Sequence, residues 1–148
     1  MHAQAKQIIA ENVLKNTLAL IEALKDNYRQ HSIRCHQRSV ENIPYATTDG
    51  RYHISVQFHE RIIEELKSGE CDIDYVIESG KKYHKVVMID DGGARSVHCF
   101  VDRKTGEVYK SASWKSPAKG VRYDLRLIKD REYLLEHADW SGGYLYAK

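Results

Sequence analysis

The sequence predicts an α+β fold, in which N-terminal helices precede a four-stranded antiparallel β-meander, a basic loop and a C-terminal helix. Apolar residues recur at three- and four-residue steps in the N-terminal part, and at every second residue from residue 71. Two short glycine-containing turns separate strongly β-prone runs. With 148 residues, the chain has the length of one domain that buries a core without a disulfide or a metal. We therefore expect a single domain over residues 1–148, with a helical part at 1–69 and the sheet, basic loop and C-terminal helix at 71–148.

Two helices are expected in the N-terminal part. Residues 3–26 form one amphipathic pattern without Gly or Pro, which fits a core helix or, as the alternative, a helix at a dimer interface. Residues 27–52 hold no sustained period, and Pro44 with the Thr-Asp-Gly turn after it marks a loop or irregular connection. A second helix is expected at 55–68, because Gly69 stands where a helix C-terminus is expected.

Period-two runs after these helices predict the sheet. Ile73, Tyr75 and Ile77 alternate with acidic residues, and Gly80 closes this first strand. The further strands are expected at residues 83–89, 95–102 and 107–112. Alternation along the third strand places Arg95, Cys99 and the valines on the core side. His98 would then share the outer face with the loop that follows the sheet.

The residues that interrupt regular structure predict the loop after the sheet and the C-terminal segment. Residues 113–120 should form a structured loop, because Pro117 removes a ladder donor and Gly120 permits a positive φ. A helix is expected at 128–138. The Tyr-Leu-Tyr run at 144–146 is expected to pack against the fold, and a sheet strand is one form that it could take.

Compartment is inferred from hydropathy and cysteine content. No stretch approaches about 18 uncharged apolar residues, and the N-terminus lacks the basic and apolar regions of a signal peptide. Three widely spaced cysteines, an odd number, indicate free thiols in a reducing compartment. We expect a cytoplasmic protein with no membrane partner.

Catalytic and metal-binding motifs are missing from the sequence. It has no Gly-x-Ser-x-Gly elbow, no Walker loop and no His-Glu-x-x-His motif. His53 begins a single His-x-Ser motif, which is half of what a two-histidine phosphoesterase needs. Cys35-His36, His53 and His59 lack the paired short spacing of a zinc site. The sequence therefore predicts a protein that is not an enzyme and that uses no cofactor or metal.

Positive charge is concentrated in one segment. Residues 110–131 carry seven bases and two acids, a charge of +5 on a chain whose net charge is +2, so the rest of the chain carries −3. This pattern suits a compact anionic ligand: small residues let backbone amides approach a phosphate, Lys and Arg supply charge, and aromatic rings stack on a base. The alternative is a solvated loop with Trp114 in the core. The candidate ligand-binding residues are Lys110, Ser113, Trp114, Lys115, Lys119, Gly120, Arg122 and Tyr123, with Arg95 and His98 from the third strand.

A resemblance rests on the same region. The run from Arg95 to Tyr123 reads Arg-Ser-Val-His-Cys-Phe-Val-Asp-Arg-Lys-Thr-Gly-Glu-Val-Tyr-Lys-Ser-Ala-Ser-Trp-Lys-Ser-Pro-Ala-Lys-Gly-Val-Arg-Tyr. It resembles a widespread family of small phage-encoded proteins, as does the closing stretch from Ala138 to Tyr146. The resemblance covers about residues 75–146, and its Trp-Lys-x-Pro-Ala-Lys string is specific. It links the chain to phage immune-evasion sponge proteins, which sequester cyclic-nucleotide or ADP-ribose-type signals of bacterial defence systems such as CBASS and Thoeris. It assigns no ligand contacts residue by residue.

The leading hypothesis is a homo-oligomer in the cytoplasm of an infected bacterial host, which binds a small cyclic nucleotide without hydrolysing it. Lys115, Lys119 and Arg122 would hold phosphates, and Trp114 or Tyr123 would stack on a base. One alternative is a single-stranded nucleic-acid binder, but the small net charge of the chain argues against it. Another is a protein-interaction inhibitor of a host enzyme that uses Tyr and Trp as anchors. A hydrolase is the weakest option.

Overall fold

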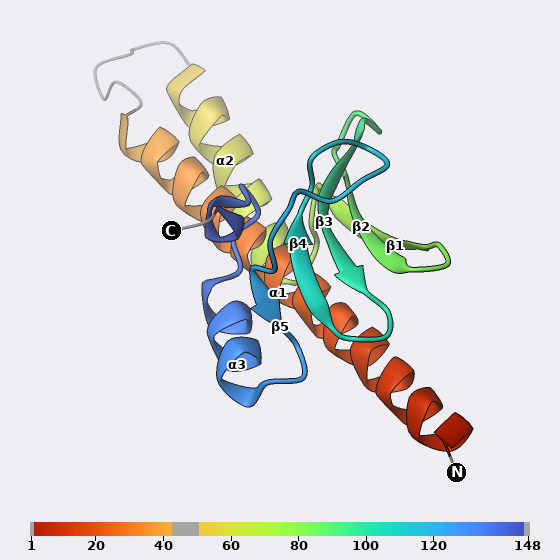
Figure 1. Cartoon of the computed structure of the whole chain (residues 1–148). Coiled ribbons are helices and arrows are strands. Elements are labelled where there is room, and N and C mark those ends of the chain that lie inside the picture. Colours follow the sequence, from red (N-terminus) through yellow and green to blue (C-terminus); the bar gives the residue numbers. More distant parts are fainter. Residues whose placement is uncertain (1, 43–50, 147–148) are drawn as a thin grey trace. The chain divides into compact units, whose positions relative to one another are not determined.

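The computed structural model describes residues 2–42 and 51–146, and its architecture is α+β as predicted (Figure 1). Its elements are α1 (His2–Asn42), α2 (Arg51–Lys67), β1 (Asp74–Ser79), β2 (Tyr83–Ile89), β3 (Arg95–Asp102), β4 (Glu107–Lys110), β5 (Tyr123–Asp124), α3 (Ile128–His137) and a 3₁₀ turn η1 (Gly143–Leu145). Contacts group the chain into two units, one formed by residues 1–25 and 72–148 and the other by residues 26–71. Pro44 and the turn after it lie outside the described residues.

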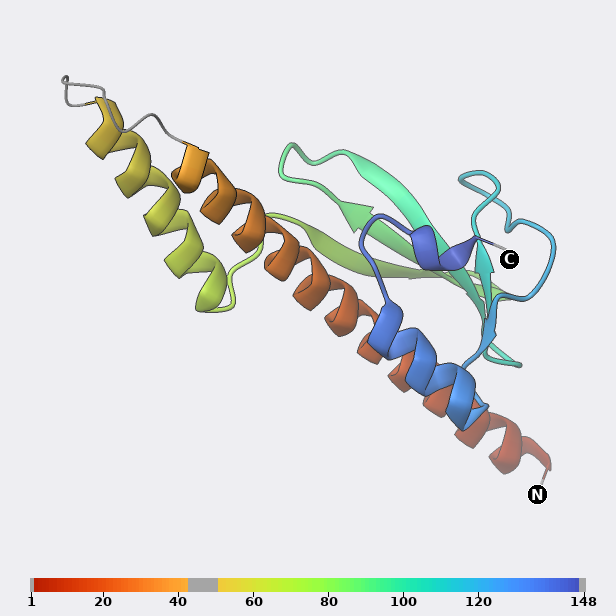
Figure 2. The ribbon, with the colours of Figure 1, turned by 90° about the vertical axis from the view of Figure 1, so that its left-hand side faces the viewer.

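The first unit is built on a five-stranded antiparallel sheet in the order β1-β2-β3-β4-β5. The first half of α1 passes along one side of this sheet in both ribbon views (Figures 1 and 2). Its buried residues Val13, Leu20 and Leu24 recur at helical spacing, so they lie on one face of the helix, and this face is buried. Residues that pair across neighbouring strands lie on the same face of the sheet. We call one of the two faces the inner face; its buried residues include Val86, Cys99, Val101 and Val108.

The β3–β4 turn shows why this region folds as the sequence predicts. Asp102 is buried, and its Oδ1 accepts the backbone N–H groups of Lys104 at 2.8 Å and Thr105 at 3.1 Å. Gly106 then adopts φ +75°, a conformation that glycine takes without a side-chain clash. The Asp-Arg-Lys-Thr-Gly string therefore encodes the tight turn directly.

A β-bulge changes the predicted faces of β3. Val86 pairs with Cys99, but the next residue, Val87, pairs with Val97, so His98 is the extra residue in the ladder. Because one extra residue reverses the alternation, Arg95 lies on the opposite face from Cys99. We call this second face the outer face; it also carries Lys85. The prediction that Arg95 lies on the core side and that His98 shares the face of the loop was therefore wrong.

The second unit is a helical hairpin made from the second half of α1 and α2. Ile33 of α1 and Ile63 and Leu66 of α2 form its buried cluster. The prediction that the first helix ends at residue 26 was wrong: α1 continues to Asn42, since no Gly or Pro interrupts residues 27–42 and a single partner helix needs few apolar residues. The stop of the second helix before Gly69 is confirmed.

The C-terminal third differs from the prediction in detail. The fourth strand ends at Lys110 rather than at 112, and a short β5 that the sequence did not predict adds a fifth strand. The C-terminal helix is confirmed at Ile128–His137. The tail is packed as expected, with Leu145 buried, but it forms a 3₁₀ turn rather than a strand.

None of the helices in the described residues contains an apolar stretch long enough to cross a bilayer. The three cysteines are free thiols, exposed at Cys35, partly covered at Cys71 and buried at Cys99. Burial raises the pKa of the Cys99 thiol to about 12, as expected for a thiol on the core side of the third strand.

Candidate functional site

The predicted ligand-binding residues do not form one site. Arg95, Trp114 and Lys115 lie at the outer face of the sheet. His98 and Lys110 line a pocket under the C-terminal segment. The remaining residues belong to the loop itself or to its connection with that segment; they are Ser113, Lys119, Gly120, Arg122 and Tyr123.

Trp114 projects from the β4–β5 loop onto the outer face. Its side chain is 44% exposed, so it does not occupy the core. The Lys85 amino group lies 4.6 Å from the centre of the indole ring, and the Arg95 guanidinium carbon lies at 6.0 Å. Arg95 also pairs with Glu78 of β1. The indole thus has two cations near its ring and an accessible part of its surface, which is the composition of a stacking platform for an anionic aromatic ligand.

Internal hydrogen bonds hold this loop in shape. The Ser113 hydroxyl accepts the backbone N–H groups of Lys115 at 3.3 Å and Ser116 at 3.2 Å. The N–H groups of Ala112 and Ser113 donate to the Ser116 carbonyl, and Ser111 bridges to Pro117. The prediction of a structured loop is confirmed. Ser113 serves the loop's own geometry, and Trp114 and Lys115 stand at its tip.

A hollow of about 340 Å³ lies beside Trp114 on the outer face; we call it the lysine hollow. Its lining residues come from the β1–β2 hairpin, β3 and the loop tip, and they are Glu78, Ser79, Gly80, Lys81, Lys82, Tyr83, Lys85, Phe100 and Lys115. Within the described part of the chain, none of these four lysines has a carboxylate within 4 Å, and the one lining carboxylate, Glu78, is paired with Arg95. The hollow therefore carries uncompensated positive charge.

Aromatic rings form the wall and floor of the lysine hollow. Phe100 is buried, with the Tyr83 ring edge-on at 5.7 Å between centroids. The Lys82 amino group lies 5.3 Å from the centre of the Tyr83 ring, and Lys85 lies 5.9 Å from that of Phe100. Lysines held against rings lose less conformational freedom when they bind an anion than fully extended ones. Positive charge and aromatic surface thus meet in this hollow.

Sequence reasoning missed the lysines that matter most for this hollow. Lys81, Lys82 and Lys85 lie outside the basic segment 110–131, and along the sequence they are most simply explained as solvated residues at a sheet edge. The signal was present in the strand register: Lys85 pairs with Phe100 across β2 and β3, on the face to which the bulge moves Arg95.

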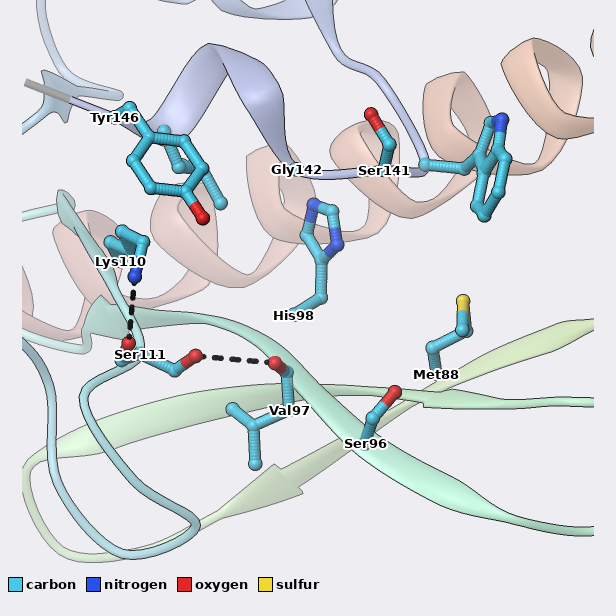
Figure 3. A pocket seen from close by; sticks show the side chains of 11 residues that line it. Met88, Ser96, Val97, His98, Lys110, Ser111, Ser141, Gly142 and Tyr146 are labelled. Carbon is cyan, nitrogen blue, oxygen red and sulfur yellow. Dashed lines mark hydrogen bonds between the residues drawn. The ribbon is translucent and has the colours of Figure 1, made fainter.

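The pocket under the C-terminal segment, which we call the inner pocket, is lined by His98 and Lys110. The sequence analysis assigned these two residues to the same site as Trp114. The volume of the inner pocket is about 310 Å³, and Figure 3 shows both side chains between the sheet and the C-terminal segment. His98 Nε2 lies 2.7 Å from the Tyr144 hydroxyl, and burial lowers the pKa of His98 to about 4. Lys110 Nζ lies 4.8 Å from the centre of the Tyr146 ring. His98 is thus a neutral packing residue, and Lys110 is the one cation among the described residues that line this pocket.

Arg122 and Tyr123 connect the loop to the C-terminal segment. Arg122 donates from Nε to the Leu145 carbonyl at 2.7 Å, and from Nη1 to the carbonyls of Lys119 at 3.0 Å and Gly120 at 2.7 Å. The Tyr123 hydroxyl donates to the backbone carbonyl of Tyr144 at 2.7 Å. These donors are engaged in holding the fold, so in this structure Arg122 acts as a brace.

A comparison with protein families identifies residues 1–147 as a match to the family of unknown function DUF7717. The chain belongs to this family. No curated protein and no solved structure matches the chain. The lysine hollow and the braced loop described above thus belong to a DUF7717 protein. Among the described residues, no group of three or more His, Cys, Asp or Glu side chains is placed to hold a metal ion.

Proposed function

We propose that this protein binds a small anionic nucleotide in the lysine hollow and sequesters it without chemical conversion. The observation that carries the proposal is the hollow itself, which is lined by aromatic rings and by four lysines that have no carboxylate partner among the described residues. Its volume is at the lower end of the usual range for small-molecule sites, about 300–1,000 Å³.

The geometry assigns roles within this proposal. Lys81, Lys82 and Lys115 reach the hollow from two segments and would neutralise phosphate oxygens. Trp114 stands at the rim and would stack on a base, with Lys85 between the base and the phosphates. Compared with the sequence-based hypothesis, Lys119 and Arg122 lose their phosphate-binding roles to lysines of the β1–β2 hairpin.

Cyclic nucleotides and ADP-ribose-type signals are the ligand class that the sequence resemblance implies. Binding without turnover would remove such a signal from solution, which is the counter-defence role expected of a phage sponge protein. A second copy of the chain could enclose the ligand from the open side of the hollow, as in many homo-oligomeric binding sites.

A thermal-shift panel tests the proposal, with cyclic dinucleotides, cyclic trinucleotides and ADP-ribose isomers at 150 mM salt. A ligand at about 100 times its dissociation constant adds about 2.7 kcal/mol of stability, a shift of several degrees for a chain of this length. Lys85→Gln with Lys115→Gln should abolish the shift. Lys119→Gln with Lys129→Gln is the control, because it removes the same charge from exposed residues outside the hollow.

Intact recovery of the bound nucleotide after heating is expected. A flat panel, or a shift that the Lys85 and Lys115 changes leave in place, would overturn the assignment. If no nucleotide shifts the melting temperature, the protein-inhibitor alternative is tested next; it predicts a stoichiometric complex with a host enzyme.

A further inference from the structure

A second basic hollow adjoins the lysine hollow at the same end of the sheet. Its volume is about 710 Å³, and it lies between the beginning of α1, the β1–β2 turn and the β3–β4 turn. Four cations line it: Lys6, Lys81, Arg103 and Lys104. Among the residues that the structure describes, no carboxylate lines it, and its remaining lining residues are Ala3, Gln7, Ile9 and Ala10. Lys81 lines both hollows, so the two are neighbours on either side of one lysine.

The two turns that carry these cations are fastened to each other. The Arg103 N–H donates to the Lys82 carbonyl at 2.9 Å, and its Nη1 donates to the Gly80 carbonyl at 2.5 Å. Asp102 precedes Arg103 in the sequence, but its side chain is buried and its Oδ1 accepts backbone N–H groups. It therefore does not neutralise the positive charge at the surface of the turn. The two turns, and with them the Arg103 side chain, are thus held in place before any ligand arrives.

Charge on this scale exceeds what a compact ligand requires. A cyclic dinucleotide carries two phosphates, which one hollow with four lysines already neutralises. The second hollow adds Lys6, Arg103 and Lys104, and none of these three has a carboxylate within 4 Å among the residues that the structure describes. Like charges gathered without counter-charges repel one another, so an arrangement of this kind is stabilised by a ligand with several phosphates.

We infer that the second hollow is a phosphate subsite, and that the protein takes linear, single-stranded oligonucleotides more tightly than compact cyclic ones. The inference rests on the proposed function, because it uses the same lysine hollow, and it makes a linear strand rather than a cyclic nucleotide the preferred ligand. One end of the strand lies in the lysine hollow, with a base on Trp114, and the phosphates continue past Lys81 toward Lys6 and Lys104. The net charge of +2, which argued against nucleic acid, is a sum over the whole chain and does not describe the local charge at this end of the sheet.

Fluorescence anisotropy with labelled hexathymidylate tests the inference, with unlabelled cyclic di-AMP as competitor. Lys6→Gln with Lys104→Gln should lower the slope of log affinity against log salt by about 1.4, since each phosphate contact of a single strand contributes about 0.7. At 0.1 M salt that slope corresponds to a loss of roughly 20-fold in hexathymidylate affinity. The affinity for cyclic di-AMP should not change, and the Lys119→Gln, Lys129→Gln control should bind both ligands as the wild type does.

The outcomes separate this inference from the proposed function. If Lys6→Gln with Lys104→Gln binds hexathymidylate within twofold of wild type, or if cyclic di-AMP binds as tightly as hexathymidylate, the second subsite is refuted while the lysine hollow stands. If Lys85→Gln with Lys115→Gln leaves cyclic di-AMP binding unchanged, the proposed function fails instead. If hexathymidylate does not bind at all, the inference is refuted, and the proposed function is then decided by the nucleotide panel alone.

Discussion

His98 makes the stability of this protein depend on pH in a defined direction. In the folded chain burial lowers the pKa of His98 to about 4, against an ordinary value of 6.5. Between these two values the unfolded chain binds a proton that the folded chain does not, so the free energy of unfolding falls as pH decreases from about 6.5 to 4. The difference between the two pKa values corresponds to a loss of about 3 kcal/mol at pH 4 relative to pH 7.

Urea unfolding at several pH values between 4 and 7 measures this loss. His98→Gln is the comparison, because it removes the titrating group and keeps a nitrogen that can reach the Tyr144 hydroxyl. The pKa of His84 is also lowered, first by burial and then by the charge of Arg103, so the wild type retains a second contribution of the same sign. The difference between wild type and variant isolates His98.

A common pH dependence in the two proteins would refute this reasoning. So would an imidazole resonance of His98 that titrates near 6.5, because it would mean that the ring is open to solvent. Either result would return His98 to the list of candidate ligand residues.

Other predictions concern packing and the loop. Gly106→Ala should lower the free energy of unfolding by about 2–3 kcal/mol, because φ +75° disfavours a side chain and the new Cβ would lie 3.2 Å from Arg126 Cγ; Gly93→Ala, which has φ +84° and open space, should lose only about 1 kcal/mol in the same urea experiment, and equal losses would contradict the contact argument. Arg122→Ala should lose about 2 kcal/mol and speed hydrogen exchange in the C-terminal segment, since a charged donor leaves three carbonyls; unchanged exchange would show that the brace is dispensable. Trp114→Ala should lower the free energy of unfolding by about 1–2 kcal/mol, because more than half of the side chain is covered and Lys85 and Arg95 lie near its ring, while weakening nucleotide binding in a titration; a loss of about 3–5 kcal/mol, as for a core tryptophan, would place the indole in the core.

The sheet was predictable because its signals are local. Short β-prone runs of apolar residues mark the long strands, and Ser-Gly, Asp-Gly and Thr-Gly pairs mark the turns between them. The second half of α1 was not predictable in this way. Its burial depends on contacts of Ile33 with α2, a segment about 30 residues further along the chain.

The site was only partly predictable, because its charges come together across strands. Summing charge along residues 110–131 led to Arg122, whose guanidinium is used inside the fold, and missed Lys81 and Lys85. The bulge at His98 was equally hidden, since one extra residue in a ladder leaves no mark in composition or period. Trp114 was identified from its neighbours in the sequence, and it does stand beside the basic hollow.

The most direct test of the nucleotide-binding surface is a titration of the ¹⁵N-labelled protein with hexathymidylate, followed by amide and indole shifts. The account predicts that the largest changes fall on the β1–β2 turn, on Lys85 and on the loop tip, and include the indole N–H of Trp114. Changes confined to the pocket of His98 and Tyr146, with the lysine hollow unaffected, would contradict it.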